Sequence, residues 1–377
     1  MRHTAGERQE RIVEPDHRYG PLRDAELAHH LGISTDTARR DVEALSVAGR
    51  LNRTRGAVSL PGAAVTGVPA IRVLSEEPAD GTDAGGLTVG LVVPHASHYF
   101  GEVIRGVREA VDASGSRLVL GITGYVPGQD EVQARRLLDT GADGLLLAPG
   151  WMYDGTEENA PCLHRGSPTA LLDRGAAAGP QPAEFDGVCT DHAAGAGLAV
   201  RHLAGLGHTG IALLAGTSAT GVQVRAGYET ALRSTGRTFP PAAMIDLPGS
   251  GADAAGMKDA AAQLAKAVDQ GTVSAALVVG DTDAILLLQA LASVAPGLRV
   301  PQDLALVAYD DEVAALSDLP LTTVAPPKYE VGQEAVRLLE QRVREQRGTG
   351  RATGARRHLA LLPELRVRRS CGAAEEE

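Results

Sequence analysis

The sequence predicts an α/β protein in which a small N-terminal domain precedes a larger, doubly wound region of two lobes. Seven apolar runs of strand length alternate with helix-length stretches along most of the chain: 87–93, 116–122, 143–149, 168–173, 209–216, 274–281 and 303–310. Continuous apolar runs without period-2 alternation indicate strands buried on both faces, as in parallel sheets covered by helices. The region is about 280 residues long, which exceeds one sheet of usual size and favours two lobes.

The helix-length stretches between these runs predict the layers that cover the sheets. They are 101–114, 132–140, 193–206, 224–234, 254–270, 283–294 and 329–347. Before the first run, residues 61–86 are rich in Pro, Gly, Ala and acidic residues without a sustained period, which is typical of an exposed linker. We therefore expect an N-terminal domain over 1–60, a linker over 61–86, a two-lobed domain over 87–370 and an acidic tail over 371–377.

The composition is that of a globular protein, with 377 residues of which 44% are hydrophobic and 22% charged. Cys162, Cys189 and Cys371 lie far apart, without a CxxC pair or a histidine at metal spacing, so neither disulfides nor a metal site is expected. The N-terminal sequence lacks an apolar signal region, and no apolar run reaches the roughly 20 residues that span a bilayer. We expect a cytoplasmic protein without a membrane partner and without a cofactor.

The net charge of −11 is unevenly distributed along the chain. Residues 1–62 contain 10 Arg and 9 Asp plus Glu, a net charge of +1, so the remaining residues carry −12. The arginines at 39, 40, 50, 53 and 55 form a basic cluster that is opposed by few acidic residues. Local basic density of this kind favours contact with phosphates, although a solvated charged surface has the same composition.

Residues 23–49 have the pattern of two short helices joined by a tight turn. Apolar residues repeat at helical spacing on one face of each helix, Gly32 permits the turn, and Ser34 suits the N-cap of the second helix. The second helix then exposes Thr35, Thr37, Arg39 and Arg40, and residues 51–60 predict a hairpin that carries Arg53 and Arg55. Such side chains reach bases and phosphates when the helix lies in a major groove, but any small amphipathic three-helix unit has the same periodicity.

The same segment resembles the DeoR-type winged helix-turn-helix. Residues 34–45 read STDTARRDVEAL, where the family has S-x-x-T-I-R-R-D-L-x-x-L, and residues 53–57 read RTRGA in the wing. The resemblance implies contacts with operator DNA from Ser34, Thr35, Thr37, Arg39, Arg40, Arg53 and Arg55. Two departures affect the expected geometry, because the wing keeps a single glycine after Arg55 and because Pro15 stops or kinks the first helix.

Residues 87–370 resemble the effector-binding domain of LacI/GalR-family repressors, which has a periplasmic-binding-protein-like (type I) fold. The segments that carry the resemblance follow the family's order: 88–110, 141–149, 173–174, 191–216, 225–232, 280–284, 304–311, 321–339 and 363–370. The resemblance implies two lobes joined by three crossovers, which we expect near 174–190, 312–322 and 348–358. The hinge helix that is usual in the family has no counterpart, because the DeoR-type wing and the linker stand in its place.

Six residues near the ends of predicted strands or helices are candidates for effector binding: Tyr99, Phe100, Asp173, Arg225, Asp281 and Asp310. Ligands of doubly wound sheets bind outside the carboxyl ends of the strands, and the resemblance implies that Arg225 and Asp310 bond the ligand. Each group has a structural alternative: core packing for the aromatic pair, a surface salt bridge for Arg225 and turn capping for Asp173. Gly280 stands where the family usually has an asparagine, so one common amide contact is absent.

Aspartate, arginine and aromatic side chains suit a polyhydroxylated effector such as a sugar or a nucleoside, with a nucleobase as an alternative. The resemblance implies a one-component repressor, a homodimer or homotetramer, whose affinity for operator DNA changes when the lobes close on the effector. A solute-binding transport component, an activator and a corepressor-dependent repressor remain alternatives. No G-x-x-x-x-G-K-[ST], G-x-S-x-G or H-E-x-x-H pattern occurs, which argues against an enzyme.

Overall fold

The computed structural model describes residues 52–54, 57–59, 72–73, 86–96, 99–126, 128–149, 166–173, 185–234, 244–248, 254–349 and 354–373. The chain divides into two compact units, Met1–Ala70 and Ile71–Glu377. In the first unit, β1 (Asn52–Thr54) and β2 (Ala57–Ser59) pair antiparallel, with Arg53 opposite Val58. This hairpin is the one expected over 51–60. The other residues expected to contact DNA, Ser34, Thr35, Thr37, Arg39, Arg40 and Arg55, lie outside the described ranges.

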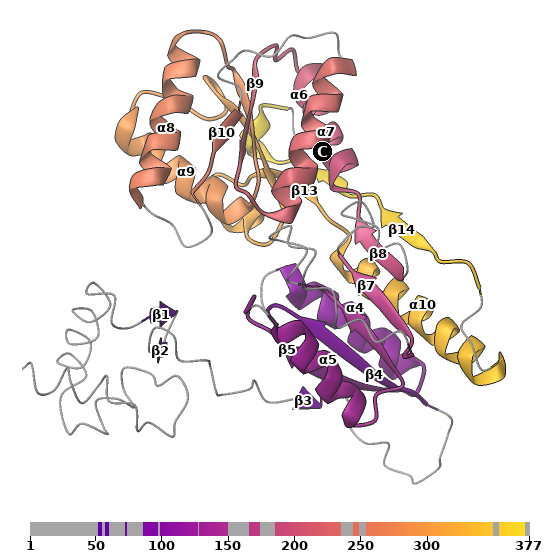
Figure 1. Cartoon of the computed structure of the whole chain (residues 1–377). Coiled ribbons are helices and arrows are strands. Elements are labelled where there is room, and N and C mark those ends of the chain that lie inside the picture. Colours follow the sequence, from indigo (N-terminus) through magenta and orange to yellow (C-terminus); the bar gives the residue numbers. More distant parts are fainter. Residues whose placement is uncertain are drawn as a thin grey trace, which may run out of the picture. The chain divides into compact units, whose positions relative to one another are not determined.

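The second unit contains two largely parallel sheets (Figure 1). The spatial order of the seven-stranded sheet is β14 (His358–Leu361), β8 (Asp186–Thr190), β7 (Thr169–Leu172), β6 (Gly144–Leu147), β4 (Thr88–Val93), β5 (Arg117–Ile122) and β3 (Arg72–Val73). That of the six-stranded sheet is β10 (Met244–Asp246), β9 (Ile211–Ala215), β11 (Ala275–Val278), β12 (Ala305–Tyr309), β13 (Thr322–Ala325) and β15 (Glu364–Arg366). Among the described strands of this unit, only β3 and β15 pair antiparallel with their neighbours. The strand β3 lies within the range expected to be linker, so part of that range is paired with β5.

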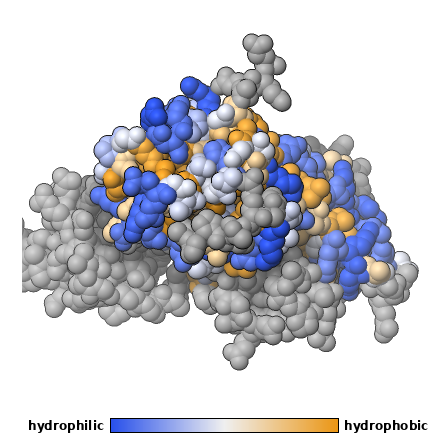
Figure 2. Space-filling model, turned by 90° about the horizontal axis from the view of Figure 1, so that it is seen from above, coloured by the Kyte–Doolittle hydropathy of each residue, from blue (hydrophilic) through white to orange (hydrophobic). Residues whose placement is uncertain are grey.

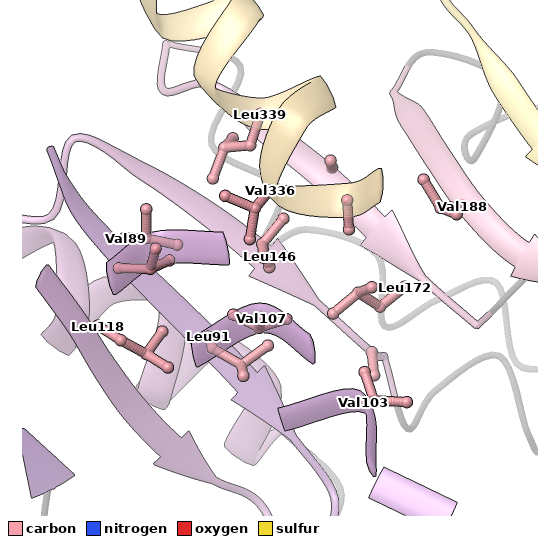
Figure 3. Close-up of a cluster of buried hydrophobic side chains, with 14 of the residues drawn as sticks. Val89, Leu91, Val103, Val107, Leu118, Leu146, Leu172, Val188, Val336 and Leu339 are labelled. Carbon is pink, nitrogen blue, oxygen red and sulfur yellow. The ribbon is translucent and has the colours of Figure 1, made fainter. Parts of the chain in front are cut away.

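The seven-stranded sheet is covered by helices on both faces. On one face, α4 (Tyr99–Ala113) and α10 (Lys328–Thr349) pack on the cluster of buried Val and Leu side chains in Figure 3. On the other face, α5 (Gln129–Asp139) packs on a smaller cluster that includes Leu137 and Leu145. The two large helices approach closely at Gly106, where a Cβ atom would lie 2.0 Å from the Tyr329 carbonyl oxygen.

The six-stranded sheet has the same layering. The helices α6 (His192–Gly205) and α7 (Ala219–Ser234) cover one face, while α8 (Ala254–Asp269) and α9 (Asp281–Val294) cover the other (Figure 1). Two short 3-10 helices, η5 (Ala314–Leu316) and η6 (Arg369–Cys371), follow later in the chain. Helices on both faces explain why strands such as β9, β11 and β12 read as continuous apolar runs, since every residue of these strands is buried. The structure therefore has the expected doubly wound α/β architecture.

Three crossovers connect the two lobes, each slightly later in the chain than expected. The chain leaves the seven-stranded sheet after Thr190, returns to that lobe after Ala325, and crosses again between Leu361 and Glu364. The expected positions, 174–190, 312–322 and 348–358, all fall earlier. The reason is that one short strand precedes each crossing, and these strands (DGVCT, TTVA and HLAL) are too polar or too short to stand out as apolar runs.

A buried arginine holds the segment that leads into the third crossover. The Arg342 side chain of α10 is 1% exposed and pairs with the fully buried carboxylate of Asp186 at the start of β8. The same guanidinium donates to the carbonyl oxygens of Gly354 and Ala355, and Asp186 accepts a further bond from the Arg357 backbone N–H at 2.7 Å. This network fixes the chain where β14 joins the sheet beside β8.

The surface carries isolated hydrophobic side chains. Val222, Leu316 and Leu362 are the most exposed of the large ones among the described residues, and Figure 2 shows hydrophobic residues set among hydrophilic ones on one face of the molecule. Scattered exposure of this kind is normal for folded proteins. Within the described part of the chain, no helix combines the length and the apolar character that crossing a membrane requires.

Candidate ligand-binding site

Aspartates follow one strand of each sheet in an unusual backbone conformation. Asp173 comes directly after β7 with φ 58°, and Asp310 comes directly after β12 with φ 94°. Left-handed backbone is tolerated best by glycine and by short polar residues such as Asp and Asn. Because the carboxyl ends of parallel strands meet at one edge of a sheet, each lobe presents a carboxylate at the edge where such folds bind ligands. Backbone strain of this kind concentrates at functional sites.

Tyr99, the first residue of α4, contacts the aspartate of its own lobe. Its hydroxyl donates to Asp173 Oδ1, and Thr190 Oγ1 at the end of β8 lies 3.2 Å from the same hydroxyl. Burial, together with the nearby Asp173 carboxylate, raises the pKa of Tyr99 well above its usual value. The phenol is therefore a hydrogen-bond donor at neutral pH.

His192 links this group of residues to the other lobe. It opens α6 directly after the first crossover, where the Asp191 carboxylate caps the helix by accepting the Ala194 N–H at 2.8 Å. The imidazole is 1% exposed, with Nδ1 at 3.1 Å from the hydroxyl of Tyr309 and Nε2 at 3.8 Å from Asp173 Oδ1. Side chains from both lobes thus meet at one polar cluster, with a separation of 3.8 Å between His192 and Asp173.

Gly195 makes room for this arrangement. A Cβ atom at this position would lie 2.4 Å from the Tyr309 hydroxyl oxygen and 2.8 Å from Pro363 Cγ. The residue therefore lets α6 approach β12 and the third crossover closely. The stretch 191–195, which reads DHAAG, supplies the helix cap, the linking imidazole and the close approach in one turn.

A charged group lies beside the cluster at the second crossover. Lys328 at the start of α10 pairs with Glu312 from the loop after β12, and its ammonium nitrogen lies 5.5 Å from the centre of the Tyr99 ring. Burial raises the pKa of Asp310 to about 6, a shift that Lys328 and His192 oppose and that Asp281 and Glu312 reinforce. Asp310 is therefore ionised at neutral pH but close to its titration range.

Tyr99, Asp173 and Asp310 are the sequence-predicted residues that the structure brings together. Phe100 instead packs into the hydrophobic core of its lobe, with its ring edge toward Tyr99. The buried Asp281 carboxylate accepts backbone N–H groups from residues 282, 313 and 314, which is a structural role. Arg225 lies in α7, and its guanidinium bonds the Ala215 carbonyl oxygen and Asp246, both at 2.6 Å.

Sequence reasoning did not single out His192, Tyr309, Lys328 or Glu312. A signal for His192 was present, since an Asp-His pair directly precedes a helix-length stretch and follows a strand. Tyr309 immediately precedes Asp310 and was visible only as part of an apolar run. The Lys328 to Glu312 pair joins residues 16 positions apart across two lobes, and no local pattern predicts it.

Comparison with known proteins agrees with this architecture. A family profile described as a DeoR-like helix-turn-helix domain matches residues 8–62, and one described as a periplasmic binding protein-like domain matches residues 200–371. The HTH-type transcriptional repressor PurR of Vibrio atlanticus (strain LGP32) is 30% identical over 264 residues, which is 68% of this chain and 75% of PurR. The HTH-type transcriptional regulator DegA of Bacillus subtilis (strain 168) is 28% identical, over 75% of this chain and 80% of DegA.

A solved structure shows the same fold over most of the second unit. A LacI family transcriptional regulator from Mycobacterium smegmatis superposes with a TM-score of 0.58 at 26% identity, covering 75% of this chain and 98% of that structure. The two-lobed arrangement, the regulators matched over three quarters of their length and the N-terminal profile all agree. The chain therefore belongs to the LacI family, whose members are transcriptional regulators rather than enzymes, and it carries a DeoR-like helix-turn-helix domain at its N-terminus.

Proposed function

We propose that this regulator is a repressor whose affinity for operator DNA is controlled by a sugar- or nucleoside-class effector bound at the cluster of Tyr99, Asp173 and Asp310. The observation that supports this most strongly is that the cluster takes side chains from both lobes at the carboxyl ends of their sheets. A ligand that bonds both lobes stabilises one arrangement of the lobes over others, and only such a differential interaction can shift a conformational equilibrium.

The chemistry of the cluster suits a neutral ligand rich in hydroxyl groups. Carboxylates at Asp173 and Asp310 accept hydrogen bonds from hydroxyls, and hydrogen bonds to a charged acceptor are stronger than neutral ones. The Tyr99 phenol and the Thr190 hydroxyl can both donate and accept. Arg225 remains a candidate through rotation of its side chain, since Ala215 is the last residue of β9 and the guanidinium therefore lies at the carboxyl edge of the sheet.

The DNA-binding half of the proposal rests on the N-terminal unit. The profile match over 8–62 and the β1–β2 hairpin support a winged helix-turn-helix. Arg39 and Arg40 on the recognition helix and Arg53 and Arg55 in the wing are the proposed phosphate and base contacts. Helix-turn-helix proteins commonly read two half-sites with two-fold symmetry, so we propose that the functional form is a homodimer or homotetramer.

Thermal-shift screening of the full chain against sugars, nucleosides and nucleobases tests the effector half. A ligand at a hundred times its Kd stabilises the folded state by about 2.7 kcal/mol, which corresponds to roughly 5–10 °C in melting temperature for a unit of this size. We expect at least one compound to give such a shift in the wild type and a much smaller one in Asp173→Asn. The proposal fails if no compound in these classes raises the melting temperature, or if Asp173→Asn responds as the wild type does.

A further inference from the structure

His192 has an unusual hydrogen-bonding state for a buried histidine. Its side chain is 1% exposed, yet Nε2 has no hydrogen-bond partner within the described part of the chain. Leaving a buried polar atom unpaired costs roughly 1–3 kcal/mol, so such atoms are rare and require an explanation. The carboxylate oxygen Oδ1 of Asp173 lies 3.8 Å from this atom.

The contact of the other ring nitrogen, Nδ1, indicates which nitrogen of the His192 imidazole carries the proton. Nδ1 lies 3.1 Å from the Tyr309 hydroxyl, whereas the alternative acceptor for that hydroxyl, the His192 carbonyl oxygen, is 3.5 Å away. We assign the phenol as the donor and Nδ1 as the acceptor because this contact is the shorter of the two. In a neutral imidazole the proton is then on Nε2, which becomes a free donor directed at the cluster.

The separation of Nε2 and Asp173 Oδ1, 3.8 Å, is too long for a direct hydrogen bond. Two hydrogen bonds of about 2.8 Å that meet at a hydroxyl oxygen at the tetrahedral angle join atoms about 4.6 Å apart. A bridging hydroxyl therefore requires the two groups to move apart by roughly 0.8 Å. Asp173 Oδ1 already accepts the Tyr99 hydroxyl, and a carboxylate oxygen has a second lone pair for a further donor.

We infer that His192 is an effector-binding residue, and that its Nε2 and the Asp173 carboxylate together bind one hydroxyl group of the effector. This inference rests on the proposed function, because it assigns a specificity determinant to the same site. The bridging hydroxyl donates to Asp173 and accepts from His192. One side chain from each lobe is thereby bonded to the same oxygen atom of the ligand.

The donor and acceptor pair selects a chemical class. A hydroxyl both donates and accepts, so it satisfies both partners. A ligand ammonium group only donates, so it cannot accept the His192 Nε2–H and places a positive charge against it. A phosphate or carboxylate oxygen only accepts at neutral pH, and it meets the negative charge of Asp173. The site is therefore selective for a neutral hydroxyl at this position, and it rejects an analogue that lacks it because buried partners are left unpaired.

Titration calorimetry with matched compounds tests this inference. A compound that binds the wild-type full chain, taken from D-ribose, D-glucose and adenosine, is compared with each of its monodeoxy analogues in the wild type, His192→Phe and His192→Gln. We expect one analogue to bind the wild type roughly ten- to a hundredfold more weakly than the parent compound. His192→Phe should bind that analogue and the parent alike, and His192→Gln, which can restore a side-chain N–H, should regain much of the discrimination.

A matched control separates binding from general effects of losing a histidine. His208 lies in the loop after α6, where its Nδ1 is 3.0 Å from Ser274 Oγ, so His208→Gln should discriminate as the wild type does. The inference is overturned if His192→Phe still discriminates against every analogue as strongly as the wild type. If no compound of the thermal-shift screen binds the wild type, it is the proposed function that fails, and the inference with it.

A second measurement covers the case in which His192→Phe does not fold. The ¹⁵N chemical shift of His192 Nε2 in the wild type should change on addition of the parent compound and stay unchanged with the discriminated analogue. Equal shifts with both compounds contradict the inference, because the bridging hydroxyl is absent from the analogue.

Discussion

The buried ion pair between Arg342 and Asp186 allows a quantitative test of how the lobe that contains β8 and β14 is held together. Arg342→Met removes the guanidinium and keeps a side chain of similar length. The Asp186 carboxylate, which is fully buried, then retains the Arg357 N–H and the guanidinium of Arg356 at 3.7 Å. The carbonyl oxygens of Gly354 and Ala355 lose their shared donor.

The expected loss of stability follows from the buried Asp186 carboxylate, which loses the guanidinium of Arg342. Breaking a buried pair by removing one partner costs about 3–5 kcal/mol, because an uncompensated charge remains buried. At roughly 2–4 °C per kcal/mol for a unit of this size, the melting temperature should fall by about 6–20 °C. Burial alone would raise the pKa of Asp186, but hydrogen bonds from Arg342 and Arg357 hold it below its ordinary value. The contribution of the pair is therefore complete above about pH 4 and is lost as the pH falls further.

Differential scanning calorimetry of the full chain at pH 7 measures this effect, with Arg342→Met/Asp186→Asn as the comparison. The double variant should melt above the Arg342→Met variant, because no charge remains buried without a partner, so the two substitutions should not be additive. A single variant that melts within about 2 °C of the wild type contradicts the assignment. A double variant that loses the sum of both single effects contradicts it as well.

Two further substitutions test the geometry and the electrostatics of the ligand site. Gly195→Ala should destabilise the protein by about 1–3 kcal/mol, because the added Cβ meets the Tyr309 hydroxyl. Gly205→Ala in the same helix, where the Cβ meets open space, should be neutral or slightly stabilising. Equal melting temperatures of the two variants refute the close approach at Gly195. Asp310→Asn should raise stability at pH 7 by on the order of 2–3 kcal/mol, since the folded-state pKa of about 6 exceeds the unfolded value. That gain should shrink as the pH falls below 6 and vanish below about 4, and a gain that is independent of pH in melting curves rules out the raised pKa.

Much of the fold was predictable from the sequence because burial on both faces leaves a strong pattern. All seven apolar runs contain a strand, and each predicted helix overlaps an observed one. The strands that were missed have other chemistry. In β13, the buried Thr322 accepts the Arg368 N–H and its backbone N–H donates to Ser370 Oγ, so hydrogen bonds replace apolar side chains there. Strands such as β10 and β15 are only three residues long and lie at sheet edges.

The candidate site was predictable only in part, because a strand end says where a residue lies but not which way its side chain points. Tyr99 and Phe100 are adjacent, yet successive residues of a helix point about 100° apart, so one faces the polar cluster and the other the core. Asp281 was expected at the ligand, but it caps backbone N–H groups around residue 313 that lie far away in sequence. Contacts across the lobes, such as His192 with Asp173, depend on the tertiary arrangement and leave no local signal.

Occupancy of the cluster between the lobes should alter the affinity of the N-terminal domain for DNA. Fluorescence anisotropy of labelled DNA from upstream of the chain's own gene, titrated with the full chain with and without a saturating compound from the thermal-shift screen, tests it most directly. We expect the Kd for DNA to change by roughly 5- to 150-fold and Arg39→Ala/Arg40→Ala to abolish specific binding. An unchanged Kd while the compound is demonstrably bound contradicts the account.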